Sequence, residues 1–563
     1  MRPLERLFIF GIFSLFSAIL ISCESDQKFY EPTFVGRPPQ NAFTGLVHLE
    51  NGEIRHYGKN LYIRSLDQGL SWDTVFIENG NLYGKQSPVN KEFLRLFSGP
   101  AGEVFSARSI GGIDGQWSVE LVDSSNAIML KPPIFIRFGK RAMVGFHTRK
   151  RDGCGSYFSD DNGKSWRKSN QVIVPGHKAG GFHKGPRWNH GAVEPTIIEL
   201  KDGRLWMLIR TAQDTHYESF SEDGGESWSD PVHSRFYGTI TMPTLHRLND
   251  GKILLLWSNT TPLPELEHYS GRWEDVFTNR DAIHAAVSDD EGKTWKGFRE
   301  IYLNPLRNDS LMATRFGELG SLDRSVHQSE CVELEDNKIL ISLGQHPEFR
   351  ALIRMDVNWL YETERMDDFS SGLENWSVQS YLKGIQGHCA YNRKPGALLA
   401  NHPADPSKRV MHLMARVDTS LLYQNKGALF NFPAGTNGVV SFRIRFNKGF
   451  KGMNIHLHDR WFNPVDTVAR HYAMMHMAIP ANLHLDDGPV LSTEKWYEFR
   501  VSWQKVHDHS EGYVTLSIDN HIIAPRIPLL NSSENGISYI HFALPFNGET
   551  NHGILLESIN SQS

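Results

Sequence analysis

The sequence predicts an all-β fold: a six-bladed β-propeller followed by a β-sandwich of the jelly-roll or lectin-like kind. Three observations support this prediction. A box of the form Ser-x-Asp-x-Gly-x-Ser/Thr-Trp occurs four times in the first part of the 563-residue chain, and hairpin patterns recur between the boxes. Beyond Met366 both signals stop, and long strand-like runs replace them. Internal repeats of antiparallel sheet units close most readily into a propeller, which leaves only short, protected edges.

Each box is typical of a tight turn between two strands. The Asp carboxylate caps the loop, the Gly takes up a positive φ, and the Trp packs back onto the sheets. The first two boxes lie 94 residues apart, against 62 and 67 for the next two intervals, so we expect one sheet unit without a box near residues 90–128. The boxes begin at Ser65, Ser159, Ser221 and Ser288.

Hairpin patterns bring the number of sheet units to about six. Each consists of an apolar strand, a two-residue turn and a second apolar strand. Three of them superimpose on turns of the Asp-Gly or Asp-Asn type, a looser copy turns at Asn-Gly, and two further hairpins precede the second box. The turns are Asp202-Gly203, Asp250-Gly251, Asp336-Asn337 and Asn51-Gly52, and the further hairpins lie around 103–122 and 133–148.

The N-terminus predicts export. Leu7 to Ile21 is apolar but short for a membrane span, and it follows a charged start. The run Leu20-Ile21-Ser22-Cys23 resembles a bacterial lipoprotein box, which implies cleavage before Cys23 and lipid attachment to it. We therefore expect a signal peptide at 1–22 and a lipoprotein anchored to the outer membrane, on its periplasmic or its outer face. A plain secretory signal and an anchor helix are the alternatives.

Three further segments complete the predicted domain organisation. Residues 23–42 are polar and contain prolines, and they are interpreted as a tether. Residues 43–365 are assigned to the propeller and residues 366–563 to the sandwich. Within the sandwich, the segment Phe450 to Trp461 contains Asn454, His456, His458 and Asp459 and is a possible sugar-binding stretch, although such domains more often support a neighbour.

Composition excludes several classes of function. The net charge of −5 gives no reason to expect nucleic acid as a partner. Apart from Cys23, the cysteines are Cys154, Cys331 and Cys389, which are too far apart in sequence to suggest a disulfide framework or a metal site. We expect buried thiols there, no metal and no cofactor. The sequence does not indicate the oligomeric state.

The four boxes resemble the Asp-box, or BNR, repeats of the sialidase-like propellers, and the resemblance covers about residues 43–362. It implies a six-bladed propeller with the boxes at the blade perimeter, away from the axis. One fold hosts many functions, so the site has to be argued from residues near the axis.

The hairpin superposition places Glu194, Met242 and Gln328 at equivalent strand starts and Arg210 at the end of the next strand. Both ends lie at one rim, so Glu194 and Arg210 should meet, as an anion-reading pair or as an ordinary rim salt bridge. Sialidases have a Glu before a strand and, about sixteen residues later, the second arginine of a triad that binds the substrate carboxylate, and these two residues are similar to that pair. No Arg-Ile-Pro stands near the start of the propeller, and Gln328 occupies the position of the sialidase tyrosine nucleophile.

Four histidine-bearing loops fall on the same rim in this alignment, which favours a shared site. One ends a second strand, one leads into Glu194, one precedes the fourth box, and one opens the sixth blade. Their candidate residues are His147; His190; Arg280, Asp281 and His284; and Asp323 and His327.

Two chemistries fit such a site, with an acidic oligosaccharide or polysaccharide containing uronic or sialic acid as the partner. Exo-glycoside hydrolysis normally needs two carboxylates, here Glu194 with Asp281 or Asp323, while Arg210 and Arg280 hold the acid group of the sugar. Elimination by a lyase or dehydratase would instead use His190 or His327 as the base. A glycan-binding lipoprotein without catalysis is the third hypothesis. The predicted catalytic set is His190, Glu194, Asp281, Asp323 and His327, and the predicted substrate-binding set is His147, Arg210, Arg280, His284 and Gln328.

Overall fold

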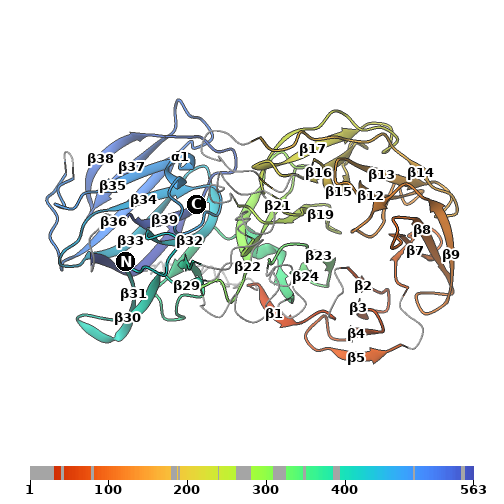
Figure 1. Ribbon diagram of the computed structural model, residues 1–563, viewed down its shortest axis with the longest axis horizontal. Coiled ribbons are helices and arrows are strands. Elements are labelled where there is room, and N and C mark those ends of the chain that lie inside the picture. Colours follow the sequence, from red (N-terminus) through yellow and green to blue (C-terminus); the bar gives the residue numbers. More distant parts are fainter. Residues whose placement is uncertain are drawn as a thin grey trace, which may run out of the picture.

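The structure is a computed structural model (Figure 1). It describes residues 31–39, 44–77, 82–178, 187, 191–238, 240–260, 280–308, 325–345, 350–383, 393–485, 488–546 and 552–563. The expected signal peptide and Cys23 lie outside these ranges. No helix that the described residues form has the length and the apolar character needed to cross a membrane.

The first part of the chain is a ring of antiparallel sheets, which we number blades 1 to 6 (Figure 1). Successive strands of a blade run from the axis to the perimeter. Blade 1 comprises β2 (Leu46–His48), β3 (Ile54–Tyr57), β4 (Leu61–Ser65) and β5 (Asp73–Phe76). Blade 2 comprises β6 (Lys85–Gln86), β7 (Phe93–Ser98), β8 (Val104–Ile110) and β9 (Gln116–Asp123). Blade 3 comprises β10 (Ala127–Ile128) and β11 (Ile134–Ile136), which both pair with β12 (Arg141–Thr148), then β13 (Cys154–Ser159) and β14 (Arg167–Lys168).

The remaining three blades complete the ring. Blade 4 comprises β15 (Val193–Glu199), β16 (Leu205–Arg210), β17 (Thr215–Ser221) and β18 (Val232–Tyr237). Blade 5 comprises β19 (Thr244–Arg247), β20 (Ile253–Trp257), β21 (Ala282–Ser288) and β22 (Lys296–Leu303). Blade 6 comprises β23 (Glu330–Glu333), β24 (Lys338–Leu343), β25 (Ala351–Asp356) and, as its outer strand, β1 (Thr33–Gly36); the 3-10 helix η3 (Val357–Tyr361) follows it.

The outer strand of blade 6 comes from the other end of the domain and closes the ring. Thr33 pairs with Arg354 and Phe34 with Ile353 in antiparallel register. This pairing corrects the assignment of residues 23–42 to a tether, because Thr33–Gly36 is a strand within that segment. Thr33 and Phe34 are exposed and Val35 and Gly36 are half-buried, so this short edge strand does not show the alternation of a half-buried strand.

The boxes are the turns between the third and fourth strands of blades 1, 3, 4 and 5. In the third box the Ser221 hydroxyl accepts a hydrogen bond from the N–H of Gly225 at 2.8 Å, and Asp223 accepts one from the N–H of Ser227 at 3.0 Å. Partial burial raises the pKa of Asp223, but the hydrogen bonds from Ser227 and Ser221 outweigh it and lower the pKa to about 2. Blade 2 is the unit that was expected to lack a box, and its β8–β9 turn is glycine-rich instead.

Each box also joins its blade to the preceding blade. The indole N–H of Trp228 donates to the Ser156 hydroxyl at 3.0 Å, and that hydroxyl donates to the carbonyl of Gly225 at 3.0 Å. The boxes therefore hold the perimeter of the ring together and lie far from the inner strands, which contact one another around the axis. Leu245 of β19, for example, donates its N–H to the Thr196 hydroxyl of β15 at 3.0 Å.

The second domain consists mainly of two sheets. The larger has the order β30-β31-β40-β33-β36-β37-β38 with β26 beside β40, and the smaller has the order β27-β32-β39-β34-β35; β28 and β29 form a separate pair. The bounds are β26 (Glu364–Asp367), β27 (Trp376–Ser377), β28 (Gln379–Tyr381), β29 (Arg393–Pro395), β30 (Ala397–His402), β31 (Asp405–Ala415), β32 (Lys426–Gly435), β33 (Gly438–Phe446), β34 (Met453–His458), α1 (Ala469–Tyr472), β35 (Met475–Ile479), β36 (Trp496–Gln504), β37 (Tyr513–Ile518), β38 (His521–Pro528), β39 (Ile537–Leu544) and β40 (His552–Gln562).

The largest hydrophobic cluster lies between these two sheets. Trp376, Phe430 and Phe542 of the smaller sheet meet Phe442 of the larger, and the Phe442 and Phe542 rings lie 5.0 Å apart. The predicted all-β fold, a propeller followed by a β-rich second domain, is confirmed. The segment Phe450 to Trp461 contains β34, and His458 and Asp459 are buried, so this segment does not present them to a sugar at the surface.

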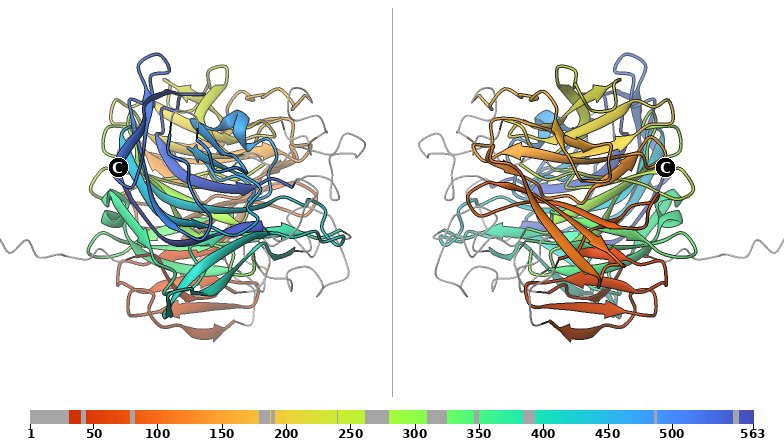
Figure 2. Two further views of the ribbon diagram at one scale, coloured as in Figure 1. Left: turned by 90° about the vertical axis from the view of Figure 1, so that its left-hand side faces the viewer. Right: turned by 90° about the vertical axis from the view of Figure 1, so that its right-hand side faces the viewer.

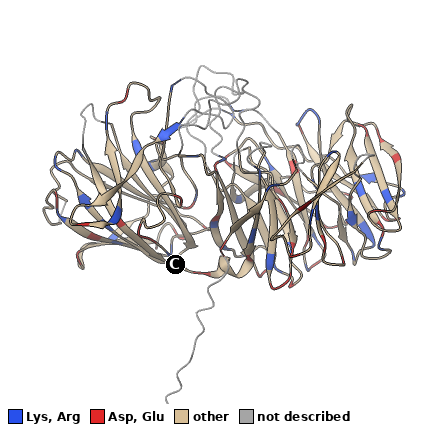
Figure 3. Ribbon diagram, turned by 90° about the horizontal axis from the view of Figure 1, so that it is seen from below, with Lys and Arg blue, Asp and Glu red and all other residues tan. Residues whose placement is uncertain are grey.

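The two domains share a buried polar interface between β22 of blade 5 and the smaller sheet of the second domain. Figure 2 shows the molecule from the second-domain end and from the propeller end. The Asn431 side chain accepts from the N–H of Glu300 at 3.0 Å and donates to the carbonyls of Phe298 and Ser538, each at 3.1 Å. Burial raises the pKa of Glu300, which accepts a hydrogen bond from Tyr539 at 2.8 Å. Figure 3 shows acidic and basic residues interspersed over the described parts of both domains.

Candidate active site

Glu194 and Arg210 meet at the axis side of blade 4. Val193 of β15 pairs with Arg210 of β16, and a β-bulge between Val193 and Thr196 turns Glu194 out of the regular ladder. Glu194 has a φ of 49°, a left-handed conformation that is uncommon for a residue with a side chain. Its carboxylate lies 2.6 Å from Nη1 of Arg210. Bulges of this kind often redirect a side chain beside a functional site.

The Glu194–Arg210 pair is nearly excluded from solvent, with side-chain exposures of 10% and 4%. Burial raises the pKa of Glu194, but the charge of Arg210 and the neighbouring His147 outweigh it and hold the pKa below its usual value. Burial lowers the pKa of Arg210 to about 10, against the effect of Glu194, and the positive charge of Arg280 contributes to the lowering. At neutral pH both groups are charged, and Arg280 adds a second guanidinium close by.

His147 adjoins this pair from blade 3. It is the second-last residue of β12, its side chain is buried, and its Nδ1 accepts a hydrogen bond from the N–H of Glu194 at 3.3 Å. Burial lowers the pKa of His147 to about 4, in spite of the carboxylate of Glu194. At neutral pH the imidazole is therefore uncharged, and because Nδ1 accepts from Glu194 its proton lies on Nε2. The structure thus brings together three of the predicted residues, His147, Glu194 and Arg210.

Lys131 is an axial residue that sequence reasoning missed. It lies between β10 and β11, where the inner strand of blade 3 is interrupted by Pro132 and Pro133. The ammonium donates to the carbonyl of Ser329 at 2.8 Å and to the hydroxyl of Thr244. Lys131 therefore extends from blade 3 across the ring to blades 5 and 6.

The environment of Lys131 brings the pKa of its ammonium group close to neutral pH. Burial lowers its pKa to about 8, while the nearby groups Cys331, Glu330 and Glu194 act in the opposite direction. Burial also raises the pKa of the Cys331 thiol to about 12, so this cysteine is protonated at neutral pH. Of the two neighbouring carboxylates, Glu330 already accepts the N–H of Leu46 at 2.9 Å, which gives it a structural role between blades 6 and 1.

The Lys-Pro-Pro run was the one signal that pointed to Lys131. Proline cannot donate to a strand ladder, so two prolines inside a hairpin indicate a break in the inner strand. Where the inner strand is interrupted at the axis, the neighbouring residue lies outside the regular ladder and its side chain can extend towards the central channel. The sequence shows the break, but the partners of Lys131 lie 113 and 198 residues further along the chain, and only the closed ring brings them together.

Arg280 and His327 form a second predicted group. Nη1 of Arg280 lies 2.9 Å from Nε2 of His327, and both side chains are buried. Nε2 of His327 also lies 3.0 Å from Oε1 of Gln345. Gln328 follows His327, and it has a φ of 64° and a half-buried side chain. Glu194 in blade 4 and Gln328 in blade 6, which were expected at equivalent positions, therefore share the left-handed backbone conformation.

The structure places Asp281 and His284 at the domain interface. Asp281 pairs with Arg393 at 2.8 Å, and both side chains are at most 4% exposed. His284 accepts the N–H of Asn259 at 3.1 Å through Nδ1 and contacts the Tyr539 hydroxyl through Nε2. Of the other predicted site residues, His190 and Asp323, and Cys23 as the predicted lipidation site, lie outside the described residues.

Taken together, the described axial residues form a site with an excess of positive charge. Glu194 faces Arg210, with Arg280 nearby, and Lys131 lies close to both Glu194 and Glu330. Guanidinium groups with spare N–H donors bind carboxylates in a bidentate geometry. Nε of Arg210 is buried and has no hydrogen-bond partner among the described residues, so this guanidinium has unused donor capacity. The arrangement can hold an anionic group and move a proton beside it.

Comparisons with known proteins found similarities to BNR-repeat and sialidase proteins. Residues 102–311 match the BNR repeat-like domain. A segment is 28% identical over 125 residues to the anhydrosialidase of Macrobdella decora, which amounts to 21% of this chain and 15% of the relative. The sialidase of Trypanosoma rangeli in complex with sialic acid aligns over 92% of this chain and 90% of its own, with 10% identity and a TM-score of 0.33. A protein of unknown function from Dyadobacter fermentans aligns over 58% of this chain and 99% of its own, with 17% identity and a TM-score of 0.39.

Proposed function

We propose that this sialidase-like protein of the BNR-repeat type is a carbohydrate-active enzyme that hydrolyses terminal glycosidic bonds of anionic oligosaccharides containing uronic or sialic acid. The cationic excess around Glu194 is the observation that carries the proposal. Arg210 has unused donor capacity and lies near Arg280, so the two guanidinium groups provide a receptor for a sugar carboxylate.

In hydrolysis, Glu194 supplies the carboxylate. Its lowered pKa keeps it ionised, which suits a nucleophile or a base that activates water and excludes the role of general acid. The leaving oxygen needs a proton, and Lys131 carries one below its pKa of about 8. Asp281, an earlier candidate for the acid, is held by Arg393 and serves the domain interface instead. The products are the free sugar and a chain shortened by one unit, with one water added.

Elimination from a uronic acid is the second candidate, and the lowered pKa of Lys131 favours it. The amine form of Lys131, which predominates above its pKa of about 8, could take the proton on the carbon next to the carboxylate. Arg210 and Arg280 would neutralise the carboxylate and stabilise the charge that develops. The ammonium formed when Lys131 takes this proton can pass it to the leaving oxygen, which departs as an alcohol, and the product has a conjugated double bond.

The cellular setting is also part of this proposal. The lipoprotein-like run ending at Cys23 supports export and attachment to the outer membrane, where an enzyme of this kind would meet polysaccharides. The non-catalytic alternative is a glycan-binding lipoprotein on the same surface. It predicts retention of the glycan without turnover.

A screen of acidic oligosaccharides with mass detection tests the proposal. Hydrolysis shortens the oligosaccharide with a gain of water, elimination yields an unsaturated product that absorbs in the far ultraviolet, and pure binding changes neither mass nor absorbance. A matched panel in which the carboxylates are reduced to alcohols should not react. Turnover of the reduced panel at the same rate would contradict the anionic-substrate assignment.

A further inference from the structure

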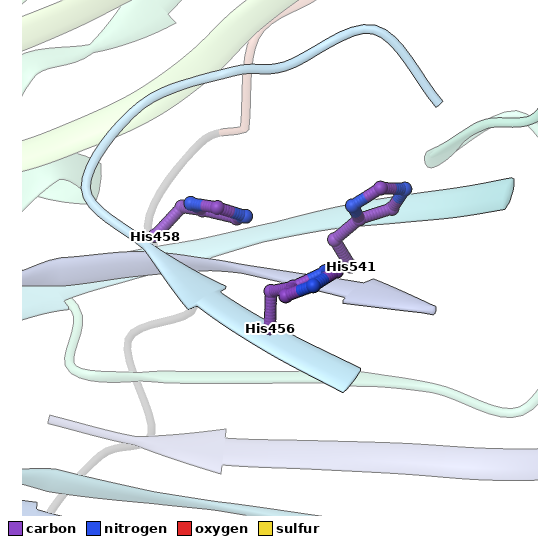
Figure 4. A group of neighbouring side chains, drawn as sticks. All are labelled: His456, His458 and His541. Carbon is purple, nitrogen blue, oxygen red and sulfur yellow. The ribbon is translucent and has the colours of Figure 1, made fainter. Parts of the chain in front are cut away.

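Three buried histidines converge in the second domain, on the smaller sheet. His456 and His458 are two residues apart on β34, so their side chains point to the same face of the sheet. His541 of β39 pairs directly with His456 across the ladder. The three rings lie on one side of the two neighbouring strands (Figure 4). Their exposures are 4%, 0% and 0%, and one nitrogen from each ring lies within 4.8 Å of the others.

We propose that His456, His458 and His541 bind a divalent transition-metal ion, with zinc as the preferred ion. Zinc favours imidazole nitrogen in a tetrahedral geometry, with bonds of about 2.0–2.1 Å that place the ligand atoms about 3.4 Å apart. Ligand atoms within 4.8 Å of one another reach that separation with small side-chain rotations. This site belongs to the second domain and is independent of the axial residues assigned to the proposed glycosidase function.

The hydrogen-bond pattern of the cluster supports a ligand. Nε2 of His541 donates to the carbonyl of Pro464 at 2.9 Å, which leaves Nδ1 unprotonated, and Nδ1 has no partner among the described residues. Both ring nitrogens of His456 are likewise buried without a partner in the described part of the chain. Buried polar atoms are almost always satisfied, and a metal-ligating histidine typically donates its second ring N–H to a backbone carbonyl.

The protonation state of the cluster also suits a metal. Burial and the neighbouring imidazoles lower the pKa values of His456 and His458 well below the ordinary value, and burial lowers that of His541 to about 4. Neutral imidazole is the form that binds metal. Without a metal, the same geometry leaves several buried nitrogens unsatisfied, each at a desolvation cost.

A tetrahedral zinc ion takes four ligands, so one further ligand, such as water, would complete the three histidines. His476 of β35 pairs with His456 on the other side of β34, with ring centroids 5.1 Å apart, but it is not one of the three residues that converge. Three protein ligands with an exchangeable fourth position are typical of zinc sites that bind a further molecule.

A metal here would stabilise the segment of the second domain that follows His458 and contacts the propeller. His458 is followed by Asp459 to Trp461, and the Trp461 N–H donates to the carbonyl of Asn259 in the propeller at 2.9 Å. Asn259 in turn donates its side-chain amide to the carbonyl of Asp459 at 2.9 Å. Pro464, the backbone partner of His541, lies on the same segment. Binding should therefore stabilise the domain contact as well as the sandwich.

Elemental analysis of the full chain, purified without a histidine tag or a chelator, tests the proposal. We expect about one zinc per chain in the wild type, and at least a tenfold lower content in His456→Ala and His541→Ala. His412→Ala is the matched control, because His412 lies on β31 of the larger sheet, outside the cluster, and this variant should keep the metal. Cobalt reconstitution should give the intense visible bands of a tetrahedral site, and these bands should be absent in both cluster variants.

Titration of the metal-free wild type with Zn²⁺ tests the proposed metal site even if the cluster variants fail to fold. Added Zn²⁺ should raise Tm by about 5 °C or more, because a ligand that binds only the folded state stabilises it. No Tm shift and no bound metal in the wild type would overturn the proposal. Retention of stoichiometric metal by folded His456→Ala and His541→Ala would overturn it too.

Discussion

Glu194 illustrates at the residue scale how the fold changes the chemistry of a side chain. Its bulge and left-handed φ direct the carboxylate to Arg210, and the ion pair keeps it charged in a buried position. Removing one partner of such a pair leaves an uncompensated buried charge, so the native pair is best tested by a substitution that preserves charge. Lysine preserves the charge of Arg210 and removes its planar donor fork.

We expect Arg210→Lys to lower kcat/KM on the acidic substrate by about a hundredfold, since it loses bidentate recognition of the carboxylate. Steady-state kinetics on the substrate found in the screen provide the measurement, and Tm confirms folding. Arg204→Lys is the control: Arg204 is a surface residue that pairs with Asp202, and its replacement should leave the rate unchanged. Equal rates in both variants would remove Arg210 from the site.

The pKa of Lys131 predicts that kcat/KM depends on pH, and the direction of this dependence distinguishes hydrolysis from elimination. Its pKa of about 8 means that the ammonium predominates below this pH and the amine above it. If Lys131 donates the proton in hydrolysis, kcat/KM falls as the pH rises through about 8; if it is the base in elimination, kcat/KM rises there. Lys131→Met should abolish this limb of the profile. A limb that persists in Lys131→Met belongs to another group.

At the scale of the element, the box is a joint between blades. In the second box, Gly163 has a φ of 79°, and a Cβ at this position would lie 2.2 Å from Cδ1 of the fully buried Leu94 in blade 2. The glycine thus serves two purposes, since it supplies the turn conformation and it permits the close approach of Leu94 from blade 2. Other box glycines also contact the preceding blade closely, such as Gly292 against Trp206.

Gly163→Ala should destabilise the chain by about 3 kcal/mol, from positive-φ strain together with overpacking against Leu94. Gly203→Ala is a matched control, because Gly203 has a φ of 88° with no atom within 4 Å of the added Cβ. It should cost only about 1 kcal/mol, the backbone part. Urea unfolding measures both. Equal losses of unfolding free energy in the two variants would show that the Leu94 side chain moves aside without a cost in stability.

At the scale of the whole molecule, burial of histidine is a general feature of the two docked domains. Burial lowers the pKa of His216 and His284 to about 3 and that of His147 and His246 to about 4, from 6.5. Such a group is neutral in the folded state, whereas the unfolded chain takes up its proton below about pH 6.5. Stability is therefore present in full above pH 6.5 and is lost as the pH falls towards about 4.

We expect the free energy of unfolding to fall by about 2 kcal/mol per buried histidine between about pH 7 and about pH 5. Urea unfolding at several pH values measures this slope. His216→Gln should reduce the total loss over this range by about 2 kcal/mol, because the variant lacks one proton-binding group. A free energy of unfolding that is constant from about pH 7 to about pH 5 would contradict the assignment of neutral buried histidines.

Much of the propeller could be predicted because its signals are local. Box and hairpin residues are adjacent in sequence, and their turn chemistry depends on neighbours within a few positions. The Glu194–Arg210 contact also followed from one hairpin, since the two residues end paired strands. The closing strand Thr33–Gly36 was missed, because its strand partner β25 lies more than three hundred residues away and its four residues show no alternation of exposed and buried positions.

The sequence by itself determined the β-repeat, the number of blades, the change of architecture after Met366 and the Glu194–Arg210 pair. Only the tertiary structure showed that Asp281 and His284 contact the second domain, that Lys131 extends across the ring, and that His456, His458 and His541 converge. The physical reason is range. Turns and hairpins are specified by short-range geometry, whereas burial, charge pairing and ligand convergence depend on ring closure and sheet pairing between distant segments.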